Sequence, residues 1–228
     1  MERLGIEFLS VFGLPPVDFV NLAADLECAY IGTALGPGPI DPPLYPPFSL
    51  KDDPALRREM LAAMRDRGVS ISLGDGFVVA PDRDIRDSAE DLEIMAELGA
   101  PRVNTISFDP DVSRSTDQIG TLVEMAADAG METTIESSPG FTPGDLPAAL
   151  DIIRTVGRPD LRLLVDTMHI VRGGATPADL AALDPDTIGY VQLSDVRLTL
   201  SGPPITRRRS STGWFPAAVN YRCSRSWL

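Results

Sequence analysis

Three polar side chains stand where short apolar runs of this sequence end, and together they could hold a metal ion. Glu136 ends the run TTIE, Asp166 ends LLVD, and Gln192 lies in YVQLSD. Carboxylate and amide oxygens are hard ligands that suit Mg²⁺ or Mn²⁺ better than a thiolate-preferring metal. We therefore predict a divalent-metal site made by these residues, with Mn²⁺ or Mg²⁺ expected and Zn²⁺ or Co²⁺ as the alternatives.

A lone histidine and further carboxylates extend this candidate site. His169, the only histidine in the chain, lies three residues after Asp166. Glu7 in GIEFLS is expected as a substrate contact, and Asp75 in LGDGF is a weaker candidate. A bound cation would polarise a carbonyl or hydroxyl of a substrate, and a nearby carboxylate could then move a proton. The alternative for each of these residues is a structural role, as a solvated carboxylate or a satisfied histidine.

These residues can meet only if the strands that carry them lie side by side. Short β-rich runs alternate with amphipathic helical runs, a rhythm typical of a parallel α/β fold. No glycine-rich phosphate-binding loop is present, so we predict a TIM-type (β/α) barrel with seven parallel strands and the eighth missing or replaced. The predicted strands are Leu4–Leu9, Ala29–Ala34, Val69–Leu73, Arg102–Ile106, Glu132–Ser137, Leu161–Asp166 and Ile188–Ser194. The predicted helices are Pro16–Leu26, Asp53–Asp66, Ile85–Leu98, Thr116–Ala129, Asp145–Val156 and Pro177–Leu183.

The order of five short motifs resembles the sugar phosphate isomerase/epimerase family of xylose-isomerase-like barrels, over about residues 3–195. The motifs are GIEFLS, AELGAPRV, IES, DTMH and VQLSD, at or before the first, fourth, fifth, sixth and seventh predicted strands. The resemblance implies that Glu136 and Asp166 bind a divalent metal. It also implies that Glu136 is a catalytic acid/base and that His169 binds substrate oxygens.

The sequence departs from the family pattern in two places. The residue that matches Gln192 is commonly His in the family. The family's fourth metal ligand is a Glu on the eighth strand, which is also the second acid/base, and no acid follows Asp195 in this chain. The resemblance therefore implies an incomplete site, and we expect weak or absent activity.

Two reaction classes and one non-catalytic role are consistent with these features. The first is a metal-dependent isomerase or epimerase that moves a proton next to a carbonyl, through an enediolate, in a small sugar, polyol or keto acid. The second is a dehydratase of inositol-derived ketones on the same barrel. The third is a truncated barrel that serves as a binding subunit. Fold alone does not choose among them.

Charge and hydropathy exclude some other classes. The chain carries 33 acidic and 20 basic residues, a formal net charge of −13. Such a charge repels nucleic acid and anionic membrane surfaces, which weakens an abasic-site endonuclease reading. No apolar run approaches the roughly 20 residues of a membrane span, and the N-terminus lacks the order of a signal peptide. We therefore expect a cytoplasmic protein.

The last part of the chain has a different composition. Residues 197–228 hold six arginines, both tryptophans and no acid. We predict a barrel domain over residues 1–196 and an irregular basic tail over 197–228. A frameshift near residue 197 would explain the composition and the missing strand, and a basic partner-binding arm is the alternative. The open sheet edge would invite pairing with a second copy, so a homodimer is expected.

Overall fold

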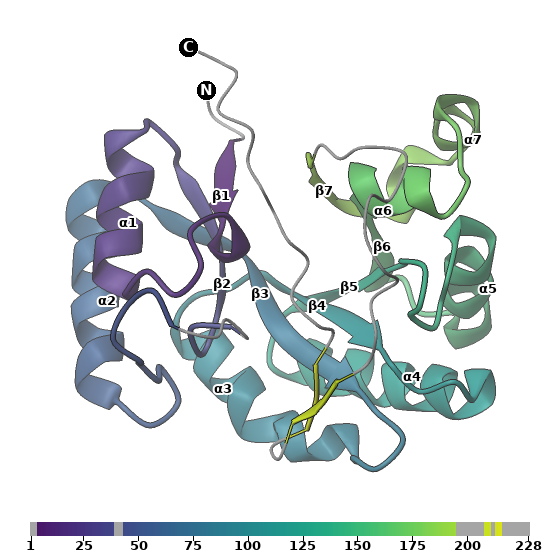
Figure 1. Ribbon diagram of the computed structural model, residues 1–228, viewed down its shortest axis with the longest axis horizontal. Coiled ribbons are helices and arrows are strands. Elements are labelled where there is room, and N and C mark those ends of the chain that lie inside the picture. The colour runs from purple at the N-terminus through teal and green to yellow at the C-terminus, as the bar shows by residue number, and fades with distance from the viewer. Residues whose placement is uncertain (1–3, 39–42, 195–207, 211–212, 216–228) are drawn as a thin grey trace.

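The computed structural model describes residues 4–38, 43–194, 208–210 and 213–215. Seven parallel strands form one sheet in which each strand pairs with its neighbours in chain order. Figure 1 shows this sheet curled into part of a barrel. The strands are β1 (Gly5–Glu7), β2 (Tyr30–Ala34), β3 (Ser70–Val79), β4 (Arg102–Ser107), β5 (Glu132–Glu136), β6 (Leu161–Asp166) and β7 (Ile188–Gln192).

Helices connect successive strands and lie on the outer face of the curled sheet (Figure 1). This alternation confirms the predicted (β/α) barrel. The α-helices are α1 (Pro16–Asp25), α2 (Pro54–Arg67), α3 (Ala89–Glu97), α4 (Val112–Asp128), α5 (Leu146–Val156), α6 (Thr167–Arg172) and α7 (Pro177–Ala181). Short 3₁₀ helices are η1 (Phe8–Ser10), η2 (Ile85–Ser88) and η3 (Pro185–Thr187).

The barrel is incomplete, as predicted. β1 and β7 form the two ends of the sheet, and no eighth strand joins it within the described residues. Two short strands near the C-terminus, β8 (Arg208–Ser210) and β9 (Gly213–Phe215), pair antiparallel with each other. The predicted domain boundary and the predicted frameshift fall on residues outside the described part of the chain.

Most differences from the sequence predictions are shifts of a few residues at the ends of elements, and two are larger. β3 continues to Val79 instead of ending at Leu73, because the chain passes through Gly74 and Gly76 with a register shift against β4. A Cβ on Gly74 would lie 2.8 Å from the sulfur of Met95, so only glycine lets α3 pack this closely. The helix α6 was not predicted, and it follows β6 without a connecting loop.

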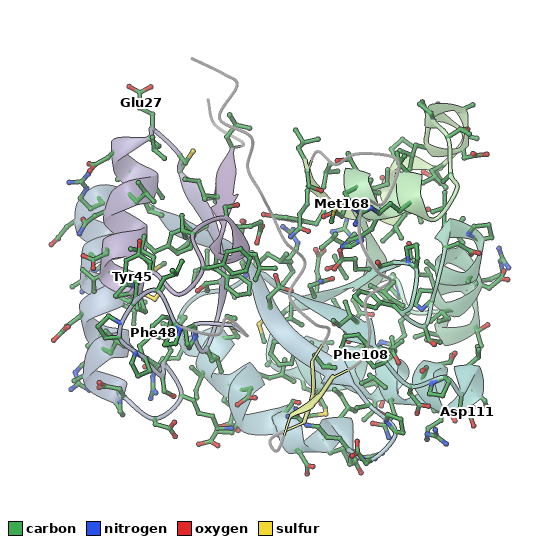
Figure 2. The ribbon with its side chains drawn as sticks, in the orientation of Figure 1. Glu27, Tyr45, Phe48, Phe108, Asp111 and Met168 are labelled. Atoms are coloured by element: carbon green, nitrogen blue, oxygen red, sulfur yellow. The ribbon has the colours of Figure 1, made fainter. Side chains whose placement is uncertain are left out.

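The apolar core fills the space between the sheet and its helices, while the inner face of the sheet carries polar groups. Figure 2 shows the side chains along both faces. On the inner face Glu132 accepts hydrogen bonds from Arg102 and Arg162, its neighbours on β4 and β6. Full burial of one aliphatic side chain contributes about 1.5–3 kcal/mol. The apolar layer between the sheet and its helices therefore stabilises the fold. The inner face of the sheet does not have to be apolar and can hold a polar site. Fully buried outer-layer side chains include Ile31, Met60, Met95, Ile119, Leu122 and Ile135.

Candidate metal centre

The carboxyl ends of four strands, and the middle of a fifth, bring the candidate residues to one end of the half-barrel. Glu7 ends β1, Glu136 ends β5, Asp166 ends β6 and Gln192 ends β7. Asp75 lies within β3, opposite Ala34 at the end of β2. In parallel (β/α) barrels this end carries the chemistry. The structure thus brings the residues predicted from the sequence together, including the weaker candidate Asp75.

Three of these side chains lie close enough to share one cation. Glu136, Asp166 and His169 each offer a ligand atom, and these atoms lie within 4.8 Å of one another. The imidazole Nε2 of His169 lies 3.5 Å from Oε1 of Glu136. The side chains of Glu136 and His169 are only 12% and 17% exposed. His169, expected to contact substrate, therefore also lies within reach of the metal position.

The helix α6 explains how Asp166 and His169 come together. Asp166 is the N-cap of α6, and its Oδ1 accepts the backbone N–H groups of Met168 at 2.7 Å and His169 at 3.2 Å. Met168 marks this helix in Figure 2. The hydroxyl of Ser194 also donates to Oδ1. Because these bonds use one oxygen, Oδ2 is available for a ligand.

A serine that sequence reasoning missed holds the other side of the His169 ring. The hydroxyl of Ser138 lies 2.8 Å from Nδ1 of His169, and Ser138 is 5% exposed. Phe141 packs near the same ring, with centroids 6.1 Å apart, and meets Phe108 edge-on at 5.1 Å. A bond at Nδ1 leaves Nε2 to face Glu136, an arrangement typical of histidines that bind metals.

Asn104 on β4 joins two of the carboxylates and was also missed. Its amide Nδ2 donates to Oδ1 of Asp75 and to Oε2 of Glu136, each at 3.2 Å. Asn104 is 2% exposed. A polar residue inside an apolar strand is costly unless it is bonded. A polar residue inside an apolar strand is therefore a signal of a functional or bonded side chain, and it applies to Asn104 in RVNTIS as well as to Gln192 in YVQLSD.

Glu7 approaches the cluster from the first strand. Its Oε1 accepts a hydrogen bond from the Tyr190 hydroxyl at 3.2 Å, and the side chain of Gln192 lies near the same carboxyl group. Its Oε2 is buried without a partner among the described residues. A Cβ on Gly32 would lie 1.9 Å from this oxygen, so the carboxyl group occupies the space a side chain would fill. Gln192 sits beside Asp166 in the β6–β7 register.

Burial and mutual repulsion perturb the acids of this cluster. Burial raises the pKa of Glu136 to about 8, with further increases from the charges of Asp75 and Asp166. Burial and the charge of Asp75 likewise raise the pKa of Glu7 to about 8. Burial raises the pKa of Asp75 to about 6 and lowers that of His169. Among the described residues, no Lys or Arg forms an ion pair with Glu7, Asp75 or Glu136.

The donor set and the orphaned oxygen of Glu7 both fit a divalent cation. Carboxylate and amide oxygens suit Mg²⁺ and Mn²⁺, and an added imidazole also suits Zn²⁺ and Co²⁺. Glu136 and Asp166 would supply the anionic ligands. His169 and Gln192 lie on neighbouring elements and could complete the set.

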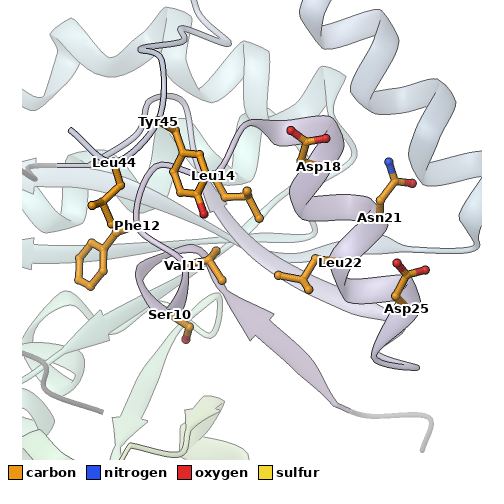
Figure 3. A pocket seen from close by; sticks show the side chains of 10 residues that line it. All are labelled: Ser10, Val11, Phe12, Leu14, Asp18, Asn21, Leu22, Asp25, Leu44 and Tyr45. Atoms are coloured by element: carbon orange, nitrogen blue, oxygen red, sulfur yellow. The ribbon is translucent and has the colours of Figure 1, made fainter.

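A separate hollow lies away from this cluster. A cavity of about 600 Å³ opens beside η1 and α1 and includes none of the cluster residues. Figure 3 shows that Leu22 of α1, together with Leu44 and Tyr45, contributes to its wall. Asp18 and Asp25 line it as well. This hollow is a feature of the outer surface and is separate from the candidate metal centre.

Solved structures share this architecture. A fusion protein of a xylose isomerase-like TIM barrel with 4-hydroxyphenylpyruvate dioxygenase is 18% identical, with a TM-score of 0.70 over 89% of this chain, which spans 32% of the fusion protein. The IolI protein with a bound zinc atom is 18% identical, with a TM-score of 0.69 over 86% of this chain and 73% of IolI. D-psicose 3-epimerase in the presence of D-fructose is 14% identical, with a TM-score of 0.65 over 88% of this chain and 76% of the epimerase.

These identities are low, so the similarity concerns the fold. No curated protein matches the sequence, and no helix in the described part of the chain is long and apolar enough to cross a membrane. A family model matches residues 20–214, which is most of the chain and includes six of the seven sheet strands and the residues of the metal centre from Asp75 to Gln192. The chain therefore belongs to the xylose isomerase-like TIM barrel family.

Proposed function

We propose that this protein is a divalent-metal-dependent isomerase or epimerase that moves a proton next to a carbonyl group of a small sugar, polyol or keto acid. The observation that carries the proposal is the group formed by Glu136, Asp166 and His169, whose ligand atoms lie within 4.8 Å of one another. The D-psicose 3-epimerase structure, of similar fold, supports the substrate class.

In this proposal, the residues of the site have two roles, which are metal binding and proton transfer. Glu136 and Asp166 would hold the ion, with Gln192 and His169 as the further candidates. When bound, the ion would polarise a substrate oxygen and stabilise the negative charge that develops there. Mn²⁺ or Mg²⁺ is the proposed ion, and the zinc in IolI makes Zn²⁺ the first alternative.

Proton transfer falls to the carboxylates. Glu136 is the proposed acid/base and would take or return a proton at its carboxyl group, which lies beside His169. The carboxyl group of Glu7 would form a hydrogen bond with a substrate hydroxyl. The Nε2 atom of His169 would bind a substrate oxygen if it does not bind the metal. The family's eighth-strand Glu has no counterpart after Asp195, so we expect slow turnover.

Metal titration tests the site directly. Mn²⁺ binding followed by electron paramagnetic resonance should saturate at one ion per wild-type chain. Glu136→Gln and Asp166→Asn should each weaken binding at least tenfold, because each removes an anionic ligand. Glu59→Gln, which changes an exposed carboxylate on α2, is the control and should bind as wild type. If wild type binds none of Mn²⁺, Mg²⁺, Zn²⁺ and Co²⁺, the metal-dependent function is wrong.

The reaction class is tested by product identification. The metal-loaded protein is incubated with a panel of ketoses and polyol-derived ketones in D₂O, and products are identified by NMR. An isomerase or epimerase places deuterium on the carbon next to the carbonyl, and the product otherwise has the same atoms as the substrate. Loss of water from the substrate would instead identify a dehydratase. Absence of any turnover with a tightly bound metal would favour a binding role.

A further inference from the structure

Asn104 occupies an unusual position between two carboxylates. It lies on β4, between β3 and β5, and is 2% exposed. Its Nδ2 lies 3.2 Å from Oδ1 of Asp75 and 3.2 Å from Oε2 of Glu136. An amide nitrogen has two N–H groups, so each carboxylate receives one of them. Both donors of this side chain are therefore committed to the acid cluster.

The orientation of this amide is fixed from both ends. On the other side, the hydroxyl of Thr134 lies 3.0 Å from Oδ1 of Asn104 and 3.3 Å from the carbonyl oxygen of Val103, and it can donate to either. A flipped amide would place Oδ1 against two carboxylates and forfeit both donations. Asn104 and Thr134 are direct partners in the β4–β5 register, and Thr134 is 1% exposed. The pair is thus held by two rigid strands.

This arrangement determines which oxygen of Glu136 faces the metal position. Because Asn104 occupies Oε2, the other oxygen, Oε1, is the one that lies 3.5 Å from His169 Nε2. Hydrogen bonds to a ligating carboxylate orient it and tune its affinity for a metal. Without Asn104, the Glu136 side chain could rotate, and its charge would lie beside Asp75 with no donor between them.

We propose that Asn104, oriented by Thr134, is the positioning residue that turns Oε1 of Glu136 toward the metal position. The inference rests on the proposed metal-dependent function and adds a residue that acts through Glu136. It touches neither substrate nor metal.

The test compares Mn²⁺ dissociation constants of four full-length chains. Asn104→Ala should weaken binding about 10–100-fold, as is usual for a partner of a metal ligand. Thr134→Val should weaken it about fivefold, the effect of one typical hydrogen bond. Thr133→Val is the matched control, because Thr133 is equally buried on the same strand and its hydroxyl has no partner among the described residues. It should bind Mn²⁺ as wild type.

The outcomes separate this inference from the proposed function. If wild type binds Mn²⁺ and Asn104→Ala binds it equally well, the positioning role is wrong and the metal site stands. If Asn104→Ala does not fold, the two threonine variants decide the question. Equal Mn²⁺ dissociation constants for Thr134→Val and Thr133→Val would then reject the role of Asn104. If wild type binds no metal, the proposed function is wrong. A double-mutant cycle of Asn104→Ala with Glu136→Gln in urea unfolding then decides, since zero coupling overturns the inference and a measurable coupling supports it.

Discussion

The carboxyl group of Glu7 fills the space next to Gly32 on β2, which has no side chain. The nearest atoms to a Cβ built on Gly32 all belong to the Glu7 carboxyl group, at 1.9–2.5 Å. No L side chain approaches another group so closely, so any larger residue would displace the carboxyl. The acid at the end of β1 thus depends on a glycine that faces it from β2.

Gly32→Ala is therefore expected to destabilise the protein by about 1–3 kcal/mol, the usual cost of overpacking. Urea unfolding measures the change. In a Glu7→Ala background the same substitution should cost less, because the conflicting carboxyl is gone. Gly36→Ala is the control, since nothing lies within 4 Å of the added methyl group. Equal effects at positions 32 and 36 would contradict this account of Glu7.

The sequence allowed the placement of some site residues and not of others, for a physical reason. Glu136, Asp166 and Gln192 each follow an apolar strand, and a strand end is visible in a single stretch of sequence. Asn104 is a polar residue inside an apolar strand, a local signal that marks it as it marks Gln192, whereas Ser138 acts through His169, 31 residues away, and no local pattern marks it. The predicted metal, substrate and catalytic roles of all these residues remain predictions.

At the scale of elements, long amphipathic helices and apolar strands were predictable, and short or irregular ones were not. Gly68 and Gly157 end α2 and α5 in the left-handed conformation, with φ of 67° and 66°, as expected of cap glycines. α6 spans only six residues, too few to produce a periodic signal. The sequence predicts that the third strand ends at Leu73, whereas β3 continues through Gly74, Asp75 and Gly76 to Val79, although glycines inside a strand weaken it.

The start of α4 offers a prediction about pH. The Asp109 side chain is fully buried, and Arg114 binds both its oxygens while the Asp111 N–H donates to Oδ1. The Arg114 guanidinium holds the pKa of Asp109 below its ordinary value of 3.8. A lowered folded-state pKa stabilises the protein above the unfolded-state value, and this stabilisation is lost as pH falls through the folded-state value.

Asp109→Asn should therefore reduce the free energy of unfolding at pH 7 and have a smaller effect near pH 3. Urea unfolding of both proteins across this range measures the difference. An Asn side chain keeps an oxygen for the Asp111 N–H, so the loss is assigned to the ion pair. A difference that stays constant from pH 7 to pH 3 would contradict this role for the carboxylate.

At the scale of the whole molecule, β1 and β7 form the two edges of the sheet, and neither pairs with a further strand among the described residues. Val191 on β7 and Leu193, the first residue after this strand, are 52% and 82% exposed. Unpaired strands with apolar side chains favour association with another chain. The homodimer expected from the sequence would use this edge.

Leu193→Lys should weaken self-association, because a charge at a sheet edge opposes pairing. Sedimentation velocity over a range of protein concentrations measures it. Val112→Lys is the matched control, since Val112 is also exposed, at 60%, and lies at the start of α4. A wild-type chain that stays monomeric at every concentration would show that the open edge does not drive association.

Asp166 links the release of a bound metal ion to the local unfolding of the short helix α6. The same carboxylate that would bind the ion also caps the N–H groups of Met168 and His169. When α6 opens, the cap is lost and His169 leaves the cluster, so the frequency of this opening would limit how long an ion stays bound. Metal should accordingly slow hydrogen–deuterium exchange at the amides of α6 more than at those of α5. A uniform response would mean that the ion is released without any opening of α6.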